Sequence, residues 1–394
     1  MSAPTVPTPA REPRIGGGAA TVPGSGIREI VMLAYGRDDV VHLEIGEPDF
    51  PTPAHIVEAG NRALASHNRY TPSAGIPALR TAIAERLHER YGLTDDPDRV
   101  VVGQGAVQAL AASLAVLLEP GDEVLLPDPA WPNYEMQTLL FGARPVRYPL
   151  RPERGFRPDP AEVASLITPR TKVLILNSPS NPTGAVLEPE LIRAMVEAAV
   201  ERGVTVISDE VYDEIVFDSV HANAAAVAPE SVISVFSFSK TYAMTGSRVG
   251  YLTGPSWFVP TVARVQEPLL SSVSAASQAS ALAALHGPQD AVRHMAGTYR
   301  ARRDLVVDRL TSAGLAIDPP AGAFYLMIPL AEGVDSRRAA LDLVPRGVAL
   351  APGTAFGETA RSHLRLSLAS SADDLNTGLD GFLDWYRQTS GGAR

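Results

Sequence analysis

Lysine is nearly absent from this chain, and one of its two lysines stands in a setting suited to chemistry. Of 34 basic residues, only Lys172 and Lys240 are lysine. A primary amine can lose its proton and attack a carbonyl carbon, whereas a guanidinium stays protonated in proteins. Lys240 follows an apolar run, is flanked by hydroxyl residues and precedes Arg248 by eight positions. Composition alone also allows both lysines to be ordinary surface residues.

A glycine loop between a predicted strand and a predicted helix could hold an anion. Val100–Val102 is typical of a buried strand, Gly103-Gln104-Gly105 follows it, and a helix is expected from about 106 to 118. Backbone N–H groups at a helix N-terminus bind phosphate well. The loop lacks the lysine of a nucleotide-binding P-loop, and glycine turns of this kind are common.

Polar residues lie at the carboxyl ends of several other predicted strands. Asp209 ends the run that begins at Val204, and Ser237 ends the run 232–236. In open α/β sheets, ligands bind at the carboxyl ends of the strands, so we expect these side chains to share one site. The alternative is that Asp209 caps the N-terminus of a helix.

The elements that must position these residues alternate along the chain. Strands separated by helices of 10 to 15 residues predict an α/β fold, a mostly parallel sheet covered on both faces. After residue 276, long helices followed by short strands indicate a smaller α+β domain. We expect a flexible N-terminal arm (1–26), a large domain (46–285) and a small domain (27–45 with 286–394).

The composition excludes several classes of protein. A net charge of −10 argues against nucleic-acid binding, and the absence of cysteine excludes disulfides and thiolate nucleophiles. Eight histidines show no H-x-x-x-H pair, so no metal site is expected. We expect no membrane span and no secretory signal, because no apolar run is long enough.

Together, these features resemble the class I and II aminotransferases of fold type I, which use pyridoxal 5′-phosphate. The resemblance runs from about Ile27 to the C-terminus. It implies a large domain with a seven-stranded sheet. It rests on six motifs in the family's order: Gly46-Glu47-Pro48-Asp49-Phe50; Tyr70 with Gly75-Ile76-Pro77; Asn177-x-Pro179-x-Asn181-Pro182-Thr183-Gly184; Ser208-Asp209-Glu210-x-Tyr212; Ser237-x-Ser239-Lys240 with Met244-Thr245-Gly246-x-Arg248-x-Gly250-Tyr251; and His363-Leu364-Arg365-Leu366-Ser367.

The resemblance implies a role for each polar residue around the cofactor ring. Lys240 would hold the cofactor aldehyde as an imine and then move the substrate's Cα proton. Asp209 would keep the ring nitrogen protonated. Asn181 and Tyr212 would donate to the phenolate oxygen, and Trp131 would stack on the ring. For Trp131, plain packing is the alternative.

The resemblance also implies two anion sites and a shared interface. The cofactor phosphate would lie on the Gly105, Ala106 and Val107 amides, Ser237 and Arg248. Ala106 and Val107 replace the hydroxyl residues of many relatives, so only their backbone is expected to contribute. Tyr70 would reach a neighbouring subunit's phosphate site, which implies a homodimer.

Arg365 would take the substrate carboxylate, with Gly46 and Asn181 sharing it. A buried structural arginine is the alternative for Arg365.

The substrate side chain is less well defined. Arg28 is a candidate cation for an acidic side chain, and position 247 is Ser where many relatives carry Trp. The aromatic residues of 320–325 favour a substrate with an apolar or aromatic side chain. We expect a donor with a neutral, aromatic or broad range of side chains and a 2-oxo acid acceptor such as 2-oxoglutarate.

Two other functions remain open at this point. A carbon–sulfur β-lyase would use the same Lys, Asp and Arg, and a non-catalytic regulator would keep only the fold. We expect a cytoplasmic enzyme.

Overall fold

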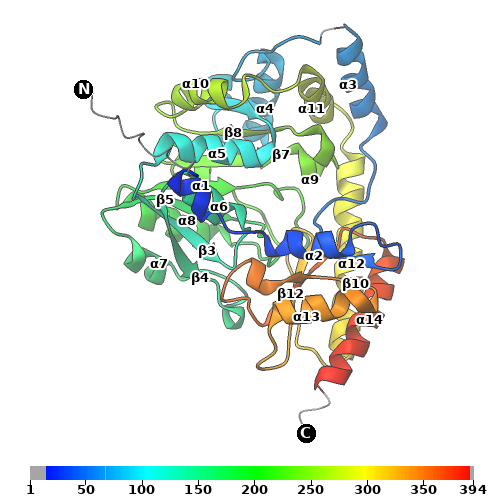
Figure 1. Cartoon of the computed structure of the whole chain (residues 1–394). Coiled ribbons are helices and arrows are strands. Elements are labelled where there is room, and N and C mark those ends of the chain that lie inside the picture. Colours follow the sequence, from blue (N-terminus) through cyan, green and yellow to red (C-terminus); the bar gives the residue numbers. More distant parts are fainter. Residues whose placement is uncertain (1–14, 67, 391–394) are drawn as a thin grey trace, which may run out of the picture.

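The computed structural model describes residues 15–66 and 68–390, which form a large α/β part and a smaller α+β part (Figure 1). In these residues the main sheet has seven strands in the order β2-β8-β7-β6-β5-β3-β4. Only β8 runs antiparallel to its neighbours. The predicted α/β fold with a mostly parallel seven-stranded sheet is therefore confirmed. Its strands are β2 (Val100–Gly103), β3 (Glu123–Asp128), β4 (Arg144–Pro149), β5 (Thr171–Asn177), β6 (Thr205–Asp209), β7 (Val232–Ser237) and β8 (Gly250–Thr253).

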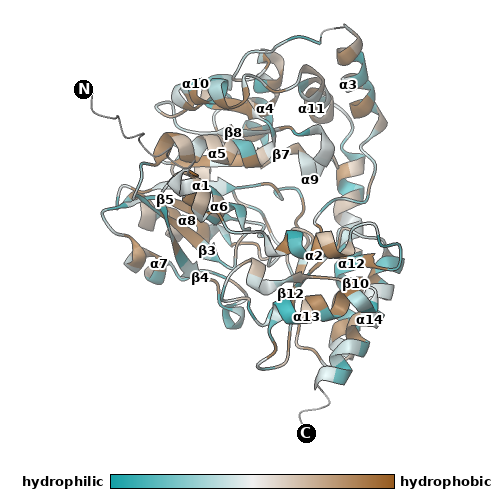
Figure 2. Ribbon diagram, in the orientation of Figure 1, coloured by the Kyte–Doolittle hydropathy of each residue, from teal (hydrophilic) through white to brown (hydrophobic). Residues whose placement is uncertain are grey.

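Helices cover both faces of this sheet, which explains why its central strands are almost wholly apolar. One buried cluster contains residues of α4, α8 and α11, and a second cluster contains residues of α5, α6 and α10. Figure 2 shows apolar colours on the strands and on the helix faces that meet them. The helices of this part are α3 (Ala54–Ser66), α4 (Pro77–Tyr91), α5 (Gly105–Leu117), α6 (Asn133–Leu140), α7 (Pro160–Leu166), α8 (Pro189–Val200), α9 (Phe238–Thr241), α10 (Val259–Leu270) and α11 (Ala275–His286).

The residue pattern did not predict strand β4. Its sequence, Arg-Pro-Val-Arg-Tyr-Pro, carries two prolines and two arginines. It lies at the sheet edge and pairs only with β3. An edge strand has one unpaired side, where proline and charge are tolerated, so the usual apolar run is missing.

The smaller part joins the beginning and the end of the chain. Its buried cluster includes Ile30 and Leu43 together with residues of α12, β9, β12 and α14. The first strand is short, because only Val41–His42 pairs, in parallel with β10. The elements are α2 (Gly26–Ala34), β1 (Val41–His42), α12 (Asp290–Ser312), β9 (Tyr325–Pro329), α13 (Ser336–Leu343), β10 (Val348–Ala349), β11 (Ala351–Pro352), β12 (His363–Ser367) and α14 (Ala372–Ser390).

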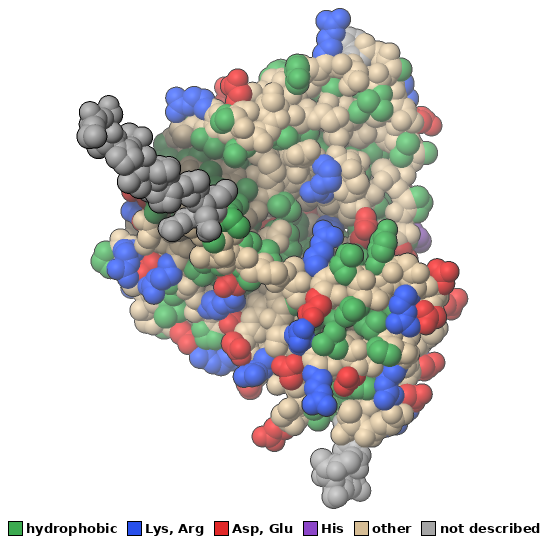
Figure 3. Space-filling model, in the orientation of Figure 1, with side chains coloured by type: hydrophobic (Ala, Val, Ile, Leu, Met, Phe, Trp, Pro, Cys, Tyr) green, Lys and Arg blue, Asp and Glu red, His purple; other side chains and the backbone are tan. Residues whose placement is uncertain are grey.

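We propose the domain division 46–285 against 27–45 with 286–394, although the buried cluster of the smaller part also contains Tyr212 and Ile215 of the larger part. On the face shown in Figure 3, charged side chains of both signs intermix over the region of α2, α13 and α14. None of the helices among residues 15–66 and 68–390 is long and apolar enough to cross a membrane.

The N-terminal arm is described only from residue 15. There it contains the short helix α1 (Gly17–Thr21), which lies beside α6 (Figure 1). Residues 1–14 lie outside the described part, and the mobility of the arm stays a prediction.

Candidate active site

A cavity of about 510 Å³ opens at the carboxyl ends of β5, β6 and β7, where the two parts of the molecule meet. This is the edge at which parallel sheets bind ligands. The predicted site residues that line it come from seven separate segments: Gly46, Ala106, Val107, Trp131, Asn181, Asp209, Tyr212, Ser237, Lys240, Arg248 and Arg365. Arg28 lines it as well. The sheet thus brings together side chains that lie far apart in the sequence.

Lys240 lies on α9, the short helix that begins where β7 ends. The Ser237 hydroxyl caps this helix by accepting from the Ser239 N–H at 3.1 Å. The Lys240 Nζ donates to the Gly46 carbonyl at 2.7 Å. Burial is the largest cause that lowers the pKa of Lys240 to about 8; the charges of Arg248 and Arg365 act in the same direction, and Glu47 opposes them. A larger share of the amine is therefore neutral and nucleophilic near pH 7.

Asp209 ends β6 and is buried. The Tyr134 hydroxyl donates to Asp209 Oδ2 at 2.6 Å, and the Asn177 amide donates to the Asp209 backbone carbonyl at 3.0 Å. Burial raises the pKa of Asp209 to about 6, and the hydrogen bond from Tyr134 opposes this rise. A cationic N–H placed in the cavity would find here a fixed carboxylate that gains from being paired.

Arg365 lies on β12 across the cavity and is 2% exposed. Its guanidinium donates to Asn181 Oδ1 at 3.0 Å and to the Glu44 carbonyl, and its Cζ lies 4.3 Å from the Tyr325 ring centroid. Within the described residues, its Nε has no hydrogen-bond partner. Burial lowers the pKa of Arg365. An arginine fixed in this way suits the planar carboxylate of a substrate.

The start of α5 forms an anion cradle with Arg248. Gly105 has φ of +78°, and a Cβ there would lie 2.5 Å from Arg248 Nη2. No side chain caps this helix, so its first backbone N–H groups can bind a ligand. Arg248 is held by a 2.9 Å hydrogen bond to the Thr245 carbonyl. The cradle fits a phosphate group.

Gly46 is required by close packing. A Cβ at this position would lie 1.7 Å from the Tyr325 hydroxyl. The same hydroxyl lies 3.0 Å from the Tyr212 hydroxyl, so Tyr325 links the Gly46 backbone to a predicted site residue. This contact lies between distant segments, and the sequence alone gave no sign of it.

Two predicted site residues, Gly105 and Tyr70, are not part of the cavity lining. Gly105 lies directly against Arg248 of the lining, and the other residue is Tyr70. Its side chain is 91% exposed, and its predicted role in a neighbouring subunit stays a prediction. Conversely, Tyr134 lines the cavity although sequence reasoning assigned it no role. Its position three residues after Trp131, across a turn in which the Tyr134 N–H donates to the Trp131 carbonyl at 3.2 Å, is the signal that could have pointed to it.

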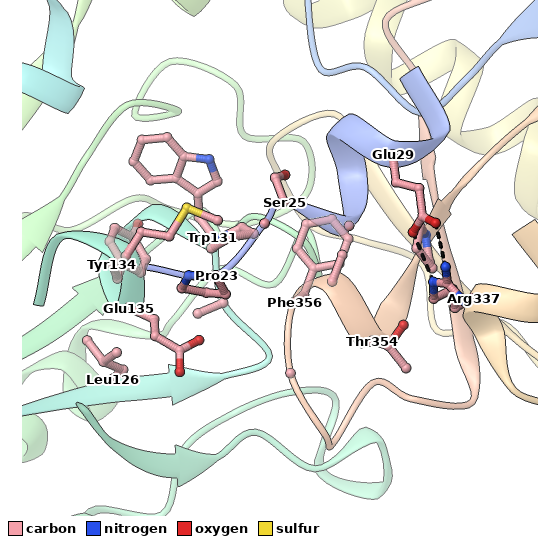
Figure 4. A pocket seen from close by; sticks show the side chains of 18 of the residues that line it. Pro23, Ser25, Glu29, Leu126, Trp131, Tyr134, Glu135, Arg337, Thr354 and Phe356 are labelled. Atoms are coloured by element: carbon pink, nitrogen blue, oxygen red, sulfur yellow. Dashed lines mark hydrogen bonds and ion pairs between the residues drawn. The ribbon is translucent and has the colours of Figure 1, made fainter. Parts of the chain in front are cut away.

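A second cavity of about 530 Å³ adjoins the first and is shown in Figure 4. Trp131 and Tyr134 line both cavities and so form part of the wall between them. Figure 4 shows the ion pair of Glu29 and Arg337 at the far side, away from this wall.

Comparison with known proteins shows the family of the chain. The family model "Aminotransferase class I and II" matches residues 38–382. The chain belongs to this family. It is 41% identical over 351 residues to the aspartate/prephenate aminotransferase of Thermus thermophilus, covering 87% of this chain and 90% of the relative. It is 40% identical over 337 residues to the LL-diaminopimelate aminotransferase of Desulforudis audaxviator, covering 84% and 86%.

Solved structures of this aminotransferase family have the same fold. The aspartate aminotransferase of Thermus thermophilus with maleate superposes with a TM-score of 0.91 at 38% identity, covering 94% of this chain and 99% of that structure. The aromatic aminotransferase of Pyrococcus horikoshii OT3 gives 0.87 at 36% identity, covering 92% and 99%. The chain is therefore a pyridoxal phosphate-dependent aminotransferase, and its cavity offers groups that fit each part of that cofactor.

Proposed function

We propose that this aminotransferase moves the amino group of an L-amino acid with a neutral, aromatic or broad range of side chains to a 2-oxo acid such as 2-oxoglutarate. The convergence of Lys240, Asp209 and Arg365 in one cavity supports the proposal most directly. When bound, pyridoxal phosphate supplies an electron sink for the charge that develops at the substrate Cα.

The residues of the chain divide the remaining work. Lys240 would hold the cofactor aldehyde and later carry the proton that leaves Cα, because its lowered pKa of about 8 lets the amine gain and lose a proton near working pH. Asp209 holds the protonated ring nitrogen, and Tyr212 and Asn181 donate to the phenolate oxygen. Trp131 covers the ring face.

Two groups of residues bind the anionic ends. The amides of Gly105, Ala106 and Val107, with Ser237 and Arg248, hold the phosphate. Arg365 binds the substrate carboxylate, with Gly46 and Asn181 beside it, and thereby orients Cα toward Lys240.

The mouth of the cavity sets the range of donors. Ile27, Val31 and Ile45 line it and suit apolar or aromatic side chains. Relatives named for aspartate and prephenate extend the range to carboxylates. Of the cations among the described lining residues, only Arg28 has no role in binding the cofactor or the α-carboxylate, so Arg28 is the group we propose for an acidic side chain.

We further propose a cytoplasmic homodimer. The full exposure of Tyr70 fits a residue that contributes to a second subunit.

The decisive experiment is a donor screen with wild-type protein and Lys240→Ala. Wild-type protein should transfer amino groups to 2-oxoglutarate or pyruvate with a 1:1 yield of amino acid and 2-oxo acid. Lys240→Ala should lose roughly 10⁴-fold or more in rate, as expected for loss of a covalent nucleophile. An undiminished rate would remove the assigned role of Lys240, and release of ammonia and pyruvate from a cysteine conjugate would favour a β-lyase.

A further inference from the structure

The Tyr134 hydroxyl contacts Asp209, and this contact has no part in the residue roles proposed above. Its hydroxyl donates to Asp209 Oδ2 at 2.6 Å, the short distance typical of a hydrogen bond to a charged oxygen. Both side chains are buried. The other oxygen, Oδ1, accepts only a longer 3.3 Å contact from the Val211 N–H among the described residues. One oxygen is thus occupied firmly and the other is left largely available.

Packing fixes Tyr134 from the other side. Its ring meets the Trp131 ring nearly at right angles, with 5.5 Å between centroids and an interplanar angle of 86°. Tyr134 lies in the first turn of α6 and Trp131 lies just before this helix, and both line the cavity. The segment that offers an aromatic face to the cofactor therefore also holds the carboxylate at the far edge of the site.

We propose that Tyr134 is a positioning residue that orients the Asp209 carboxylate through Oδ2 and favours its ionised form. This inference rests on the proposed function, in which Asp209 pairs with the ring nitrogen of the cofactor. A carboxylate held by a donor keeps its charge to lower pH than a buried carboxylate without one.

The charged surroundings of Asp209 show why such a donor is needed. Glu210 adds negative charge from the next position of the chain, and burial disfavours ionisation. The titratable groups nearest to Asp209 are Tyr134 on α6, Glu210 and Tyr212. The charged groups elsewhere in the cavity lining are Arg28, Glu44, Glu47, Lys240, Arg248 and Arg365.

The test uses Tyr134→Phe, which keeps the ring and removes only the hydroxyl. Its matched control is Tyr148→Phe, since Tyr148 is a buried tyrosine whose hydroxyl donates to a backbone carbonyl, that of Ile175, at 2.7 Å. The dissociation constant of pyridoxal phosphate is measured from pH 5.5 to 8.5 for wild type and both variants. The same measurements are made for Asp209→Asn and for the double variant Tyr134→Phe/Asp209→Asn.

Tyr134→Phe should weaken cofactor binding roughly 10-fold near pH 7, the typical effect of a hydrogen bond to a charged group. The loss should grow as the pH falls, because the carboxylate takes up a proton at higher pH than in wild type. Tyr148→Phe should leave binding within about 2-fold of wild type. Added to Asp209→Asn, Tyr134→Phe should cause almost no further loss, because the effect runs through Asp209.

Two results would overturn the inference, and they are distinguishable. If Asp209→Asn binds the cofactor less well but Tyr134→Phe does not, Tyr134 has no positioning role and the proposed function stands. If Asp209→Asn binds as wild type does, the role of Asp209 fails and the inference fails with it. The ratio of the dissociation constants at pH 6 and pH 8 serves as a second measure, because a reduced folded fraction does not change it.

Discussion

The two halves of the catalytic cavity differ in how firmly their residues are held. In the cofactor half, Asp209 and Asn181 are buried and hydrogen-bonded to other segments. At the mouth, Arg28 and Ile45 are exposed, and within the described residues the Arg28 guanidinium has no hydrogen-bond or ion-pair partner. The chemistry thus depends on a few rigid contacts, whereas the choice of substrate depends on surface positions that can change at little cost to stability.

The largest effect that would test this contrast is expected from Arg365→Gln. This substitution leaves the substrate carboxylate without its charged partner in a buried site. We therefore expect kcat/KM for amino and 2-oxo acids to fall roughly 100-fold or more. The effect should appear mainly in KM. Arg365→Lys, which keeps the charge but loses the fork, should retain part of the activity.

Comparison with a substrate that lacks the carboxylate completes this test. The half-reaction with a simple primary amine should change far less in Arg365→Gln than the reaction with an amino acid. Equal losses for both substrates would make Arg365 a structural residue.

A second prediction concerns stability without the cofactor. The pKa of Asp209 is about 6 in the folded chain against 3.8 as the reference value, so burying the ionised carboxylate costs stability. At 1.36 kcal/mol per pKa unit, the cost at pH 8 is roughly 2–3 kcal/mol. Asp209→Asn should therefore make the cofactor-free protein more stable at pH 8, measured as the free energy of unfolding in denaturant.

The pH dependence gives the sign of this effect. The folded state binds the Asp209 proton more tightly than the unfolded state, so the cost is absent below about pH 4 and complete above about pH 7. The advantage of Asp209→Asn should grow as the pH rises through this window. An advantage that stays constant from pH 4 to pH 8 would contradict the prediction.

The smallest effect is expected at the mouth of the cavity. Arg28→Gln should lower kcat/KM for aspartate about 5- to 10-fold relative to phenylalanine, because an exposed ion pair contributes only about 1 kcal/mol. Arg37→Gln is the control, since Arg37 is a nearby arginine paired with Asp39 at 2.7 Å. An unchanged aspartate-to-phenylalanine ratio in Arg28→Gln would separate Arg28 from substrate choice.

The sequence predicted the cofactor half better than the mouth for a physical reason. Asp209 and Lys240 each lie directly after an apolar strand, and strand ends share one edge of a parallel sheet. Tyr134 contacts Asp209 across 75 positions of the chain, and Tyr325 packs on Gly46, so neither contact leaves a local pattern. Strand β4 was missed because an edge strand need not be apolar on both faces.

Because the chain has only two lysines, their positions relative to the cavity have a practical consequence. Lys172 is exposed near the start of β5, at the opposite end of the sheet from the cavity, whereas Lys240 is partly buried within it. Apart from the α-amino group, an amine-reactive linker would therefore find one accessible attachment point. Tethered through Lys172, the enzyme would be immobilised in a nearly uniform orientation with its catalytic opening facing the solution.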